Sequence, residues 1–300
     1  MYEELQGTAK TILNSIYGVV AYNKFILFNE IIPASITSTA RQLNYWVQQQ
    51  SRNNNFIPLY GDTDSIFLSL ESDKSFDVFV NQVKDFKIIL NTSFKDFMKK
   101  FTSNNYVIEN QKNEINFEKS YNKILFTNTK KRYFGTIKYY KGKIKEEETL
   151  SVTGLETRRD DTPNYFKQHL LKMYKILLDS DKDKVREYFN FIKKDIKKCK
   201  VEDLIIKIKM SRDVNDYENI PIHLRALQNS GIEIRRGEQV QMIYVKGDKE
   251  VLHWHEGLNN YEIDFDKYIE NFFVNKILLI DENLKDIFNK DRSLGEFIKW

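Results

Sequence analysis

Two short apolar segments flank a tight polar turn near residue 62 and indicate a β-hairpin. The apolar residues before and after the turn are Phe56, Ile57, Leu59, Ile66, Phe67 and Leu68. Apolar runs separated by Gly and Asp predict two antiparallel strands joined by a tight turn over residues 56–70. If its flanks are buried, such a hairpin holds its polar tip rigidly, as a catalytic site requires.

The tip of this hairpin carries two carboxylates two positions apart, Asp62 and Asp64. In a strand such residues lie on one face, and a tight turn can direct their oxygens toward a common point. Hard divalent cations such as Mg²⁺ take oxygen ligands, so carboxylates at a turn suit a metal that also binds substrate phosphates. The alternative is an ordinary polar turn, because Gly-Asp and Asp-Ser are common in turns.

A segment near the N-terminus places three chemically useful side chains on one helix face. Lys10, Asn14 and Tyr17 stand at positions i, i+4 and i+7. An ammonium, an amide and an aromatic ring together suit a nucleoside triphosphate, with the ammonium near the phosphates and the ring beneath the base or sugar. The alternative is three ordinary surface residues of an amphipathic helix.

The remaining patterns predict an α+β protein. Helical periodicity covers residues 3–17, 33–50, 75–101, 164–178, 182–197 and 266–281. Extended or strand-like patterns cover residues 19–29, 106–152 and 206–244. A domain boundary is expected near residues 153–160.

Composition narrows the class of protein. The chain has 300 residues, 41% of them hydrophobic and 30% charged, which fits a globular protein of one large or two modest domains. The single cysteine, Cys199, excludes an internal disulfide framework. The sequence contains neither an apolar run of about 18 residues nor a signal-peptide pattern. We therefore expect a cytoplasmic protein without a membrane partner.

Basic and aromatic residues are interleaved between residues 119 and 145. The formal net charge of +4 is too small to identify a nucleic-acid-binding protein, but this segment is rich in Lys and Arg and has no Asp or Glu. Such a segment suits contacts with phosphates and with sugars or bases. The alternative is a solvated sheet face with aromatic cross-strand pairs.

Two motifs resemble DNA polymerase family B. The hexapeptide Tyr-Gly-Asp-Thr-Asp-Ser at residues 60–65 matches the palm-domain metal motif of that family letter for letter. Residues 10–18 resemble the Lys-x-x-x-Asn-Ser-x-Tyr-Gly helix of the fingers. Thr37 and Arg41 fit the Thr-x-x-Gly-Arg pattern that follows, except that Ala40 replaces the glycine.

Two further segments resemble DNA-binding parts of this family. Residues 130–135 look like the Lys-Lys-Arg-Tyr segment that approaches the minor groove of the primer-template duplex, where a Lys and a Tyr can check shape without selecting a sequence. Residues 153–160 resemble the segment that leads into the thumb, with Thr153 in place of a Lys. The resemblance assigns DNA binding to Lys130, Lys131, Tyr133, Arg158 and Arg159.

The resemblance also implies a domain order and a set of ligands. Residues 1–50 correspond to the end of the fingers and its connection to the palm, residues 51–155 to the palm, and residues 156–300 to a mostly helical thumb. The implied catalytic metal ligands for two Mg²⁺ ions are Asp64 and Asp62, with Glu118 as a weaker candidate. The implied ligands of the incoming deoxynucleoside triphosphate are Lys10, Asn14 and Tyr17.

Two parts of such a polymerase are not found in the sequence. A further essential palm Asp of the family lies upstream of the fingers helix, and this chain begins nine residues before Lys10. The proofreading exonuclease is also missing. We therefore expect the C-terminal subunit of a split phage or archaeal polymerase, completed by a second chain. The alternatives are a non-catalytic DNA-binding or processivity protein, and a truncated piece of a longer polymerase.

The C-terminal tail carries a weaker resemblance. Residues 292–300 place apolar side chains at Leu294, Phe297 and Ile298, which suits a short helical turn in a hydrophobic groove. The segment looks like the tails with which replicative polymerases bind a sliding clamp, although the usual leading Gln is missing. The alternative is a frayed amphipathic terminus.

Overall fold

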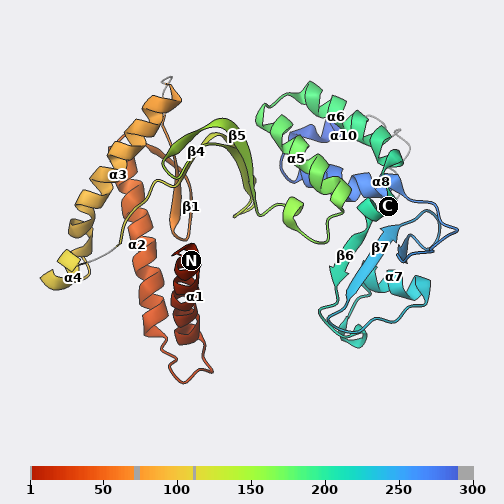
Figure 1. Ribbon diagram of the computed structural model, residues 1–300, viewed down its shortest axis with the longest axis horizontal. Helices are drawn as coiled ribbons and strands as arrows, with labels where there is room; N and C mark the ends of the chain where they lie inside the picture. The colour runs from red at the N-terminus through yellow and green to blue at the C-terminus, as the bar shows by residue number, and fades with distance from the viewer. Residues whose placement is uncertain (1, 71–74, 111–112, 290–300) are drawn as a thin grey trace. The chain divides into compact units, whose positions relative to one another are not determined.

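The chain forms two compact units, Met1–Glu118 and Lys119–Trp300. The computed structural model describes residues 2–70, 75–110 and 113–289 (Figure 1). The first unit contains a two-stranded sheet and the second contains two three-stranded sheets, all antiparallel and accompanied by helices. The predicted α+β class is therefore confirmed. Within the described ranges, the helices are too short or too polar to cross a membrane.

The first unit combines three long helices with a hairpin. Its elements are α1 (Tyr2–Ala21), α2 (Ile31–Asn53), β1 (Ile57–Asp62), β2 (Ser65–Ser69), α3 (Phe76–Met98) and α4 (Asn105–Asn110). The helices predicted at residues 3–17, 33–50 and 75–101 are confirmed, and so is the hairpin within residues 56–70.

The connection between α1 and α2 differs from the prediction. Residues 19–29 are not extended, because α1 continues to Ala21 and the chain then turns. The side-chain oxygen of Asn29 accepts a hydrogen bond from the backbone N–H of Ile31 at 2.9 Å and so caps the start of α2. The aromatic residues of this stretch give it a strand-like pattern. Its backbone instead follows from the end of α1 and from the cap at the start of α2.

The strand-like pattern predicted from residue 106 onward begins too early. Residues 105–110 form the short helix α4, because Asn104 Oδ1 accepts a hydrogen bond from the backbone N–H of Tyr106 at 3.0 Å. The first strand of the second unit starts at Lys119. A local cap therefore prevails over the β-propensity of the side chains in this segment.

An aromatic core joins α2, α3 and the hairpin. The ring of Trp46 lies 5.1 Å from that of Phe97, and Phe56 stacks on Phe86 at 4.8 Å between ring centroids. The half-buried hairpin residues that pack against this core are Ile66, Leu68 and Leu70. One side of the hairpin is therefore fixed to two long helices.

The second unit begins with a sheet and continues with helices that surround a large core. Its strands are β3 (Lys119–Phe126), β4 (Tyr133–Tyr140), β5 (Lys143–Thr153), β6 (Ile206–Lys209), β7 (Gln239–Tyr244) and β8 (Val251–His253). Its helices, including short turns, are η1 (Glu156–Arg158), α5 (Asn164–Leu178), α6 (Lys182–Asp195), η2 (Ile196–Lys198), η3 (Val201–Leu204), η4 (Val214–Asp216), α7 (Ile222–Ser230), α8 (Phe265–Ile269), η5 (Glu270–Val274), α9 (Asn275–Leu278), η6 (Glu282–Leu284) and α10 (Lys285–Asn289).

Most predicted elements of the second unit are confirmed. Helix α5 has the predicted bounds, and α6 with η2 covers the predicted helix at residues 182–197. The strand-rich stretch at 206–244 is confirmed only in part, because it also contains helix α7. That helix ends at Gly231, whose φ of 65° is the left-handed conformation that glycine adopts freely.

One hydrophobic core extends from the first sheet to the last helix of this unit. Phe134 of β4 is fully buried and stacks on Tyr174 of α5 at 4.7 Å between centroids. The same core includes Leu155 and residues of α6, α8, α9 and α10. The segments around residues 130–134 and 154–159 are thus anchored to the same packed interior.

Candidate active site

The tip of the hairpin is a two-residue turn attached to helix α2. Asp62 ends β1 and pairs with Ser65, so Thr63 and Asp64 form the turn. The side-chain N–H of Asn44 in α2 donates to the backbone oxygen of Thr63 at 2.7 Å. This hydrogen bond fixes the tip of the hairpin to a helix that is itself packed in the aromatic core.

The backbone of the turn is strained at Thr63. Its φ of 50° lies in the left-handed region, which a β-branched side chain rarely adopts. The Thr63 hydroxyl donates to Asp62 Oδ1 at 3.0 Å, and the Ser65 hydroxyl donates to the backbone oxygen of Asp62 at 3.2 Å. Strain of this kind persists where surrounding structure imposes it, and it is frequent at functional sites. The turn therefore orients the Asp62 carboxylate.

The apolar flanks of the hairpin are buried on one side only. Phe56 is buried, whereas Ile57 is 40% exposed and Leu59 is 51% exposed. Ile66 and Leu68 are half-buried against the core of α2 and α3. The hairpin is thus held by one packed face and by Asn44, and not by burial of both flanks.

The donor atoms at the tip suit a hard cation. The Asp64 side chain is exposed and that of Asp62 is half-buried, so their carboxylate oxygens fit Mg²⁺ in type and accessibility. Over residues 2–70, 75–110 and 113–289, three or more His, Cys, Asp or Glu side chains do not gather as a metal site. Glu118 is exposed and does not join the two hairpin carboxylates in such a group. Its assignment as a metal ligand stays a prediction.

Helix α1 places the three residues predicted to bind a nucleotide at the surface. Lys10, Asn14 and Tyr17 are exposed, and their spacing puts them on one helix face. The three side chains are accessible to a ligand in this structure. Their role in nucleotide binding stays a prediction.

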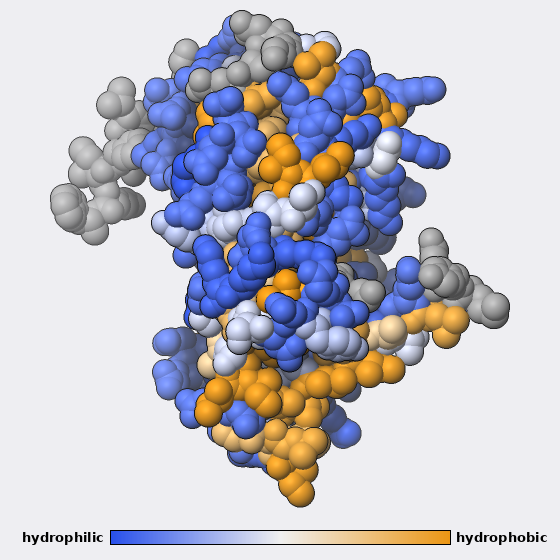
Figure 2. Space-filling view, turned by 90° about the vertical axis from the view of Figure 1, so that its left-hand side faces the viewer, coloured by the Kyte–Doolittle hydropathy of each residue, from blue (hydrophilic) through white to orange (hydrophobic). Residues whose placement is uncertain are grey.

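Helix α1 and the residues that follow it expose a large apolar surface. The exposed apolar residues of α1, of the start of α2 and of the turn between them, which we call the α1–α2 surface, are Leu5, Ile12, Leu13, Ile16, Tyr22, Phe25, Ile26, Leu27, Phe28, Ile31, Ile32 and Ile36. Figure 2 shows apolar side chains gathered at the lower end of the view, where the α1–α2 turn lies in Figure 1. An exposed apolar surface of this extent is typical of an interface with another polypeptide segment.

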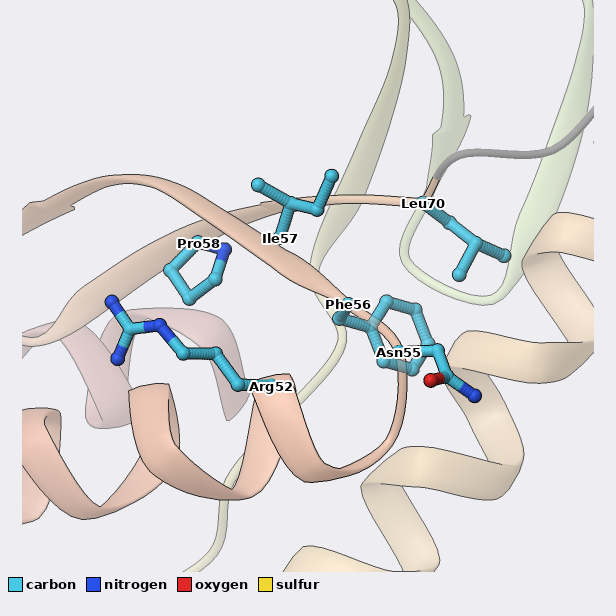
Figure 3. A pocket seen from close by; sticks show the side chains of 6 residues that line it. All are labelled: Arg52, Asn55, Phe56, Ile57, Pro58 and Leu70. Atoms are coloured by element: carbon cyan, nitrogen blue, oxygen red, sulfur yellow. The ribbon is translucent and has the colours of Figure 1, made fainter.

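A pocket of about 570 Å³ lies at the opposite end of the hairpin from the two carboxylates. Figure 3 shows its lining, which consists of Arg52, Asn55, Phe56, Ile57, Pro58 and Leu70. The pocket opens at the start of β1, whereas Asp62 ends that strand. It contains none of the residues that the sequence predicted to be functional.

In the second unit, the turn before β4 carries the predicted minor-groove residues. Lys130 and Lys131 are exposed, and Tyr133 is half-buried with its ring 5.6 Å from that of Phe126 on the paired strand. Lys131 has a φ of 65°, an unusual value for a residue with a side chain. The turn therefore has a defined shape that presents two lysines to the surface.

The chain near residue 154 approaches this turn closely. A Cβ atom added to Gly154 would lie 2.1 Å from the backbone oxygen of Lys131, and the φ of Gly154 is +68°. Only a glycine fits both the conformation and the space. The turn at residues 130–133 and the beginning of the segment at residues 153–160 are thus brought together within this unit.

The second segment predicted to bind DNA contains two arginines, Arg158 and Arg159, which lie in different local surroundings. Arg158 ends the short turn η1. Arg159 donates two hydrogen bonds to Asp161, from Nε to Oδ1 at 2.9 Å and from Nη2 to Oδ2 at 2.6 Å. This paired carboxylate raises the pKa of Arg159, and Arg159 lowers the pKa of Asp161. Arg159 is therefore held by an internal ion pair at the surface.

The basic segment between residues 119 and 145 has features of both its interpretations. The cross-strand pair of Phe126 and Tyr133 is the aromatic pairing expected of a sheet face. Lys123 binds Asp179 of the same unit at 2.6 Å, so this lysine has an internal partner. Lys130 and Lys131 lie in a turn and not on the sheet, which favours a role in binding for these two.

Two residues of these sites were not assigned by sequence reasoning. Asn44 holds the hairpin tip, and a polar residue within an amphipathic helix offers no pattern that would identify it. Glu156 is almost completely buried beside cationic side chains, as described below. Glu156 lies in the segment that resembles the entrance to the thumb, but its burial depends in part on Lys276, far along the chain.

Comparison with known proteins decides the family. The family model described as DNA polymerase family B matches residues 1–284. The chain belongs to DNA polymerase family B. Among curated relatives, DNA polymerase 1 of Aeropyrum pernix is 28% identical over 259 residues, and DNA polymerase 1 of Sulfolobus acidocaldarius is 25% identical over 286 residues. These alignments cover 82% and 90% of this chain.

The fold agrees with that of a solved family B polymerase. The structure of the family B DNA polymerase from Pyrobaculum calidifontis matches 93% of this chain with a TM-score of 0.61 and 23% sequence identity. The match covers 34% of that structure, and the two relatives above are covered over 24% and 29% of their length. The chain thus spans about a quarter to a third of the proteins that it resembles.

Proposed function

We propose that this chain contributes the palm metal ligands, the nucleotide-binding helix and the thumb of a DNA-directed DNA polymerase. The observation that carries the proposal is the hairpin tip, where Asp62 and Asp64 stand in the family's metal motif on a turn strained at Thr63 and held by Asn44. Two carboxylates on a turn whose backbone is held in place suit a reaction that depends on positioned metal ions.

The chemistry assigned to the tip is two-metal nucleotidyl transfer. Asp64 and Asp62, with Glu118 as a further candidate, would hold Mg²⁺, which supplies Lewis-acid chemistry to the primer 3′-hydroxyl and to the triphosphate. Lys10 would neutralise the triphosphate, Asn14 would hydrogen-bond to it, and Tyr17 would pack beneath the base or sugar.

The second unit would hold the primer-template duplex. The proposed DNA-binding residues are Lys130, Lys131, Tyr133, Arg158 and Arg159. Cations of the turn before β4 and of η1 would neutralise phosphates, and the half-buried Tyr133 would contact the minor groove, where a shape test needs no sequence preference.

We propose further that a polypeptide carrying the exonuclease and the remaining palm Asp completes the active site. Two observations support this. The chain spans only a quarter to a third of the polymerases it resembles. The α1–α2 surface exposes many apolar side chains, among them Ile26 at 92% exposure, which another segment would cover. A split gene of phage or archaeal origin and a cytoplasmic location stay predictions.

The proposed clamp contact belongs to a segment outside the described residues. Residues 292–300 carry the tail that resembles clamp-binding peptides. A sliding clamp is therefore proposed as a partner from the sequence pattern alone.

Primer extension tests the proposal. The chain would be mixed with the polypeptide that carries the exonuclease and upstream palm of the same polymerase, and extension of a labelled primer would be followed with Mg²⁺. We expect extension by the mixture and little or none by either part alone. Extension by this chain alone would contradict the need for a second part, and DNA binding without extension by the mixture would support a non-catalytic DNA-binding protein.

A further inference from the structure

Glu156 is a buried carboxylate between two cations of the second unit. It is 5% exposed and begins η1, two residues after Gly154 and its close approach to Lys131. Its Oε1 atom lies 3.9 Å from Arg132 Nη1 and 3.6 Å from Lys276 Nζ. A buried charge without partners is costly, so the two cations are required to keep this carboxylate in place.

The two cations belong to different elements of the second unit. Arg132 belongs to the turn that exposes Lys130 and Lys131, whereas Lys276 belongs to α9, a helix of the large core. Glu156 thus connects the turn proposed to bind DNA to the helical interior of the unit. Arg132 and Lys276 are themselves only partly exposed, at 32% and 27% of their side-chain surface.

The backbone of the same turn is held by two additional contacts. The backbone N–H and the hydroxyl of Thr127 both donate to the backbone oxygen of Arg132 at 3.1 Å. Gly154 fits against the backbone oxygen of Lys131. The ion pair with Glu156, at 3.9 Å, directs the Arg132 side chain inward from a turn whose backbone these contacts hold.

The buried Tyr174 hydroxyl is influenced by the charge of this carboxylate. Tyr174 is fully buried, and its hydroxyl has no hydrogen-bond partner among the described residues. Burial raises the pKa of Tyr174, and the charge of Glu156 raises it further. Nearby, Arg159 is occupied by Asp161. The charges in this region are thus largely paired within the protein.

We propose that Glu156 is a positioning residue for DNA binding: it draws Arg132 inward, so that Lys130, Lys131 and Tyr133 are the groups of the turn that face the duplex. This rests on the DNA-binding function proposed above. Of the three consecutive cations, Arg132 is paired with a buried carboxylate, and Lys130 and Lys131 are exposed at the surface.

The test compares Glu156→Gln with a matched control, Glu147→Gln. Glu147 is an exposed glutamate of β5 in the same unit. The first measurement is amide hydrogen exchange of the free chain, which does not depend on DNA. We expect faster exchange at residues 130–133 and 154–158 in Glu156→Gln, partial rescue in Glu156→Asp, and no change in Glu147→Gln. Unchanged exchange at these residues would overturn the positioning role.

The second measurement is the salt dependence of DNA binding. Release of Arg132 from the carboxylate makes this arginine available to phosphates, so log K should fall more steeply with log salt in Glu156→Gln, by about 0.9 for the new phosphate contact. The double variant Glu156→Gln/Arg132→Gln should lose that increase. A merely structural role would lower the melting temperature and leave the slope unchanged, which would overturn the proposal.

The two measurements separate failure of this inference from failure of the proposed function. If the unchanged chain does not bind DNA, the proposed function is contradicted, and hydrogen exchange still decides whether Glu156 holds the turn. If the chain binds DNA and Glu156→Gln changes neither exchange nor slope, the positioning role is wrong and DNA binding stands.

Discussion

Gly154 illustrates how a single residue shapes the region proposed to bind DNA. Its φ is +68°, and an added Cβ would meet the backbone oxygen of Lys131 at 2.1 Å. A backbone oxygen cannot move aside as a flexible side chain can. Any side chain at position 154 must therefore displace the turn that presents Lys130 and Lys131.

We predict that Gly154→Ala destabilises the second unit by about 3 kcal/mol, because backbone strain and a steric clash add together. The matched control is Gly142→Ala, since Gly142 also has a positive φ, at 90°, but has open space around its Cβ position. That variant should cost roughly 1 kcal/mol, from conformation alone. Urea denaturation measures both, and equal losses in the two variants would contradict the clash.

For single residues, the sequence predicts positions that depend on neighbours adjacent in the chain, and not positions that depend on partners far along it. Asp62 and Asp64 were placed at the tip of a hairpin because the turn and its apolar flanks are adjacent in the chain. Asn44 and Glu156 were not assigned roles, since each acts on a partner that the fold brings close. The partner of Glu156 in α9, Lys276, lies in a helix far along the chain.

Elements with a long periodic pattern were predicted well, and short elements were not. Helices α1, α2, α3, α5 and α6 each extend over several turns, so their apolar spacing is distinct from that of a strand. Helices α4 and α7 are short, and their side chains carry no clear period. Local caps at Asn104 and at Gly231 fix them instead.

Helices α5 and α6 share a polar network within the core. His169 Nδ1 lies 2.8 Å from the Tyr188 hydroxyl, and His169 Nε2 lies 3.7 Å from Asp195 Oδ2. The Tyr165 hydroxyl donates to the same Asp195 oxygen at 3.1 Å. Burial lowers the pKa of His169, although the charge of Asp195 opposes this shift. Burial therefore favours the neutral form of His169, against the charge of Asp195.

This network predicts a pH dependence of stability. His169 has a lower pKa in the folded chain than its ordinary 6.5, so the unfolded chain binds more protons and the free energy of unfolding falls as the pH falls below 6.5. The pKa values of His223 and His253 are lowered too, and contribute in the same direction. Urea denaturation across this range should show a shallower dependence for His169→Gln. An equally steep dependence in that variant would exclude His169 as a source.

As a whole, the chain is a member of DNA polymerase family B that forms two compact units. The hairpin tip with its carboxylates belongs to the first unit, and the turn around Lys131 with Glu156 behind it belongs to the second. The proposal of a larger assembly around this chain rests on the α1–α2 surface and on the limited coverage of relatives. That assembly stays a prediction from the sequence, whereas the extent of the exposed apolar surface became visible only in the fold.

The most direct test is the rate of primer extension by the complete polymerase that contains this chain, in one or two polypeptides, with Asp64→Asn. The control is Asp85→Asn, which removes the charge of an exposed aspartate on α3. If Asp64 holds a catalytic metal ion, loss of several kcal/mol of transition-state stabilisation should slow extension about a thousandfold while DNA binding is retained. The control should extend normally. Extension by Asp64→Asn at the unchanged rate would contradict the assignment of the hairpin as the catalytic metal site.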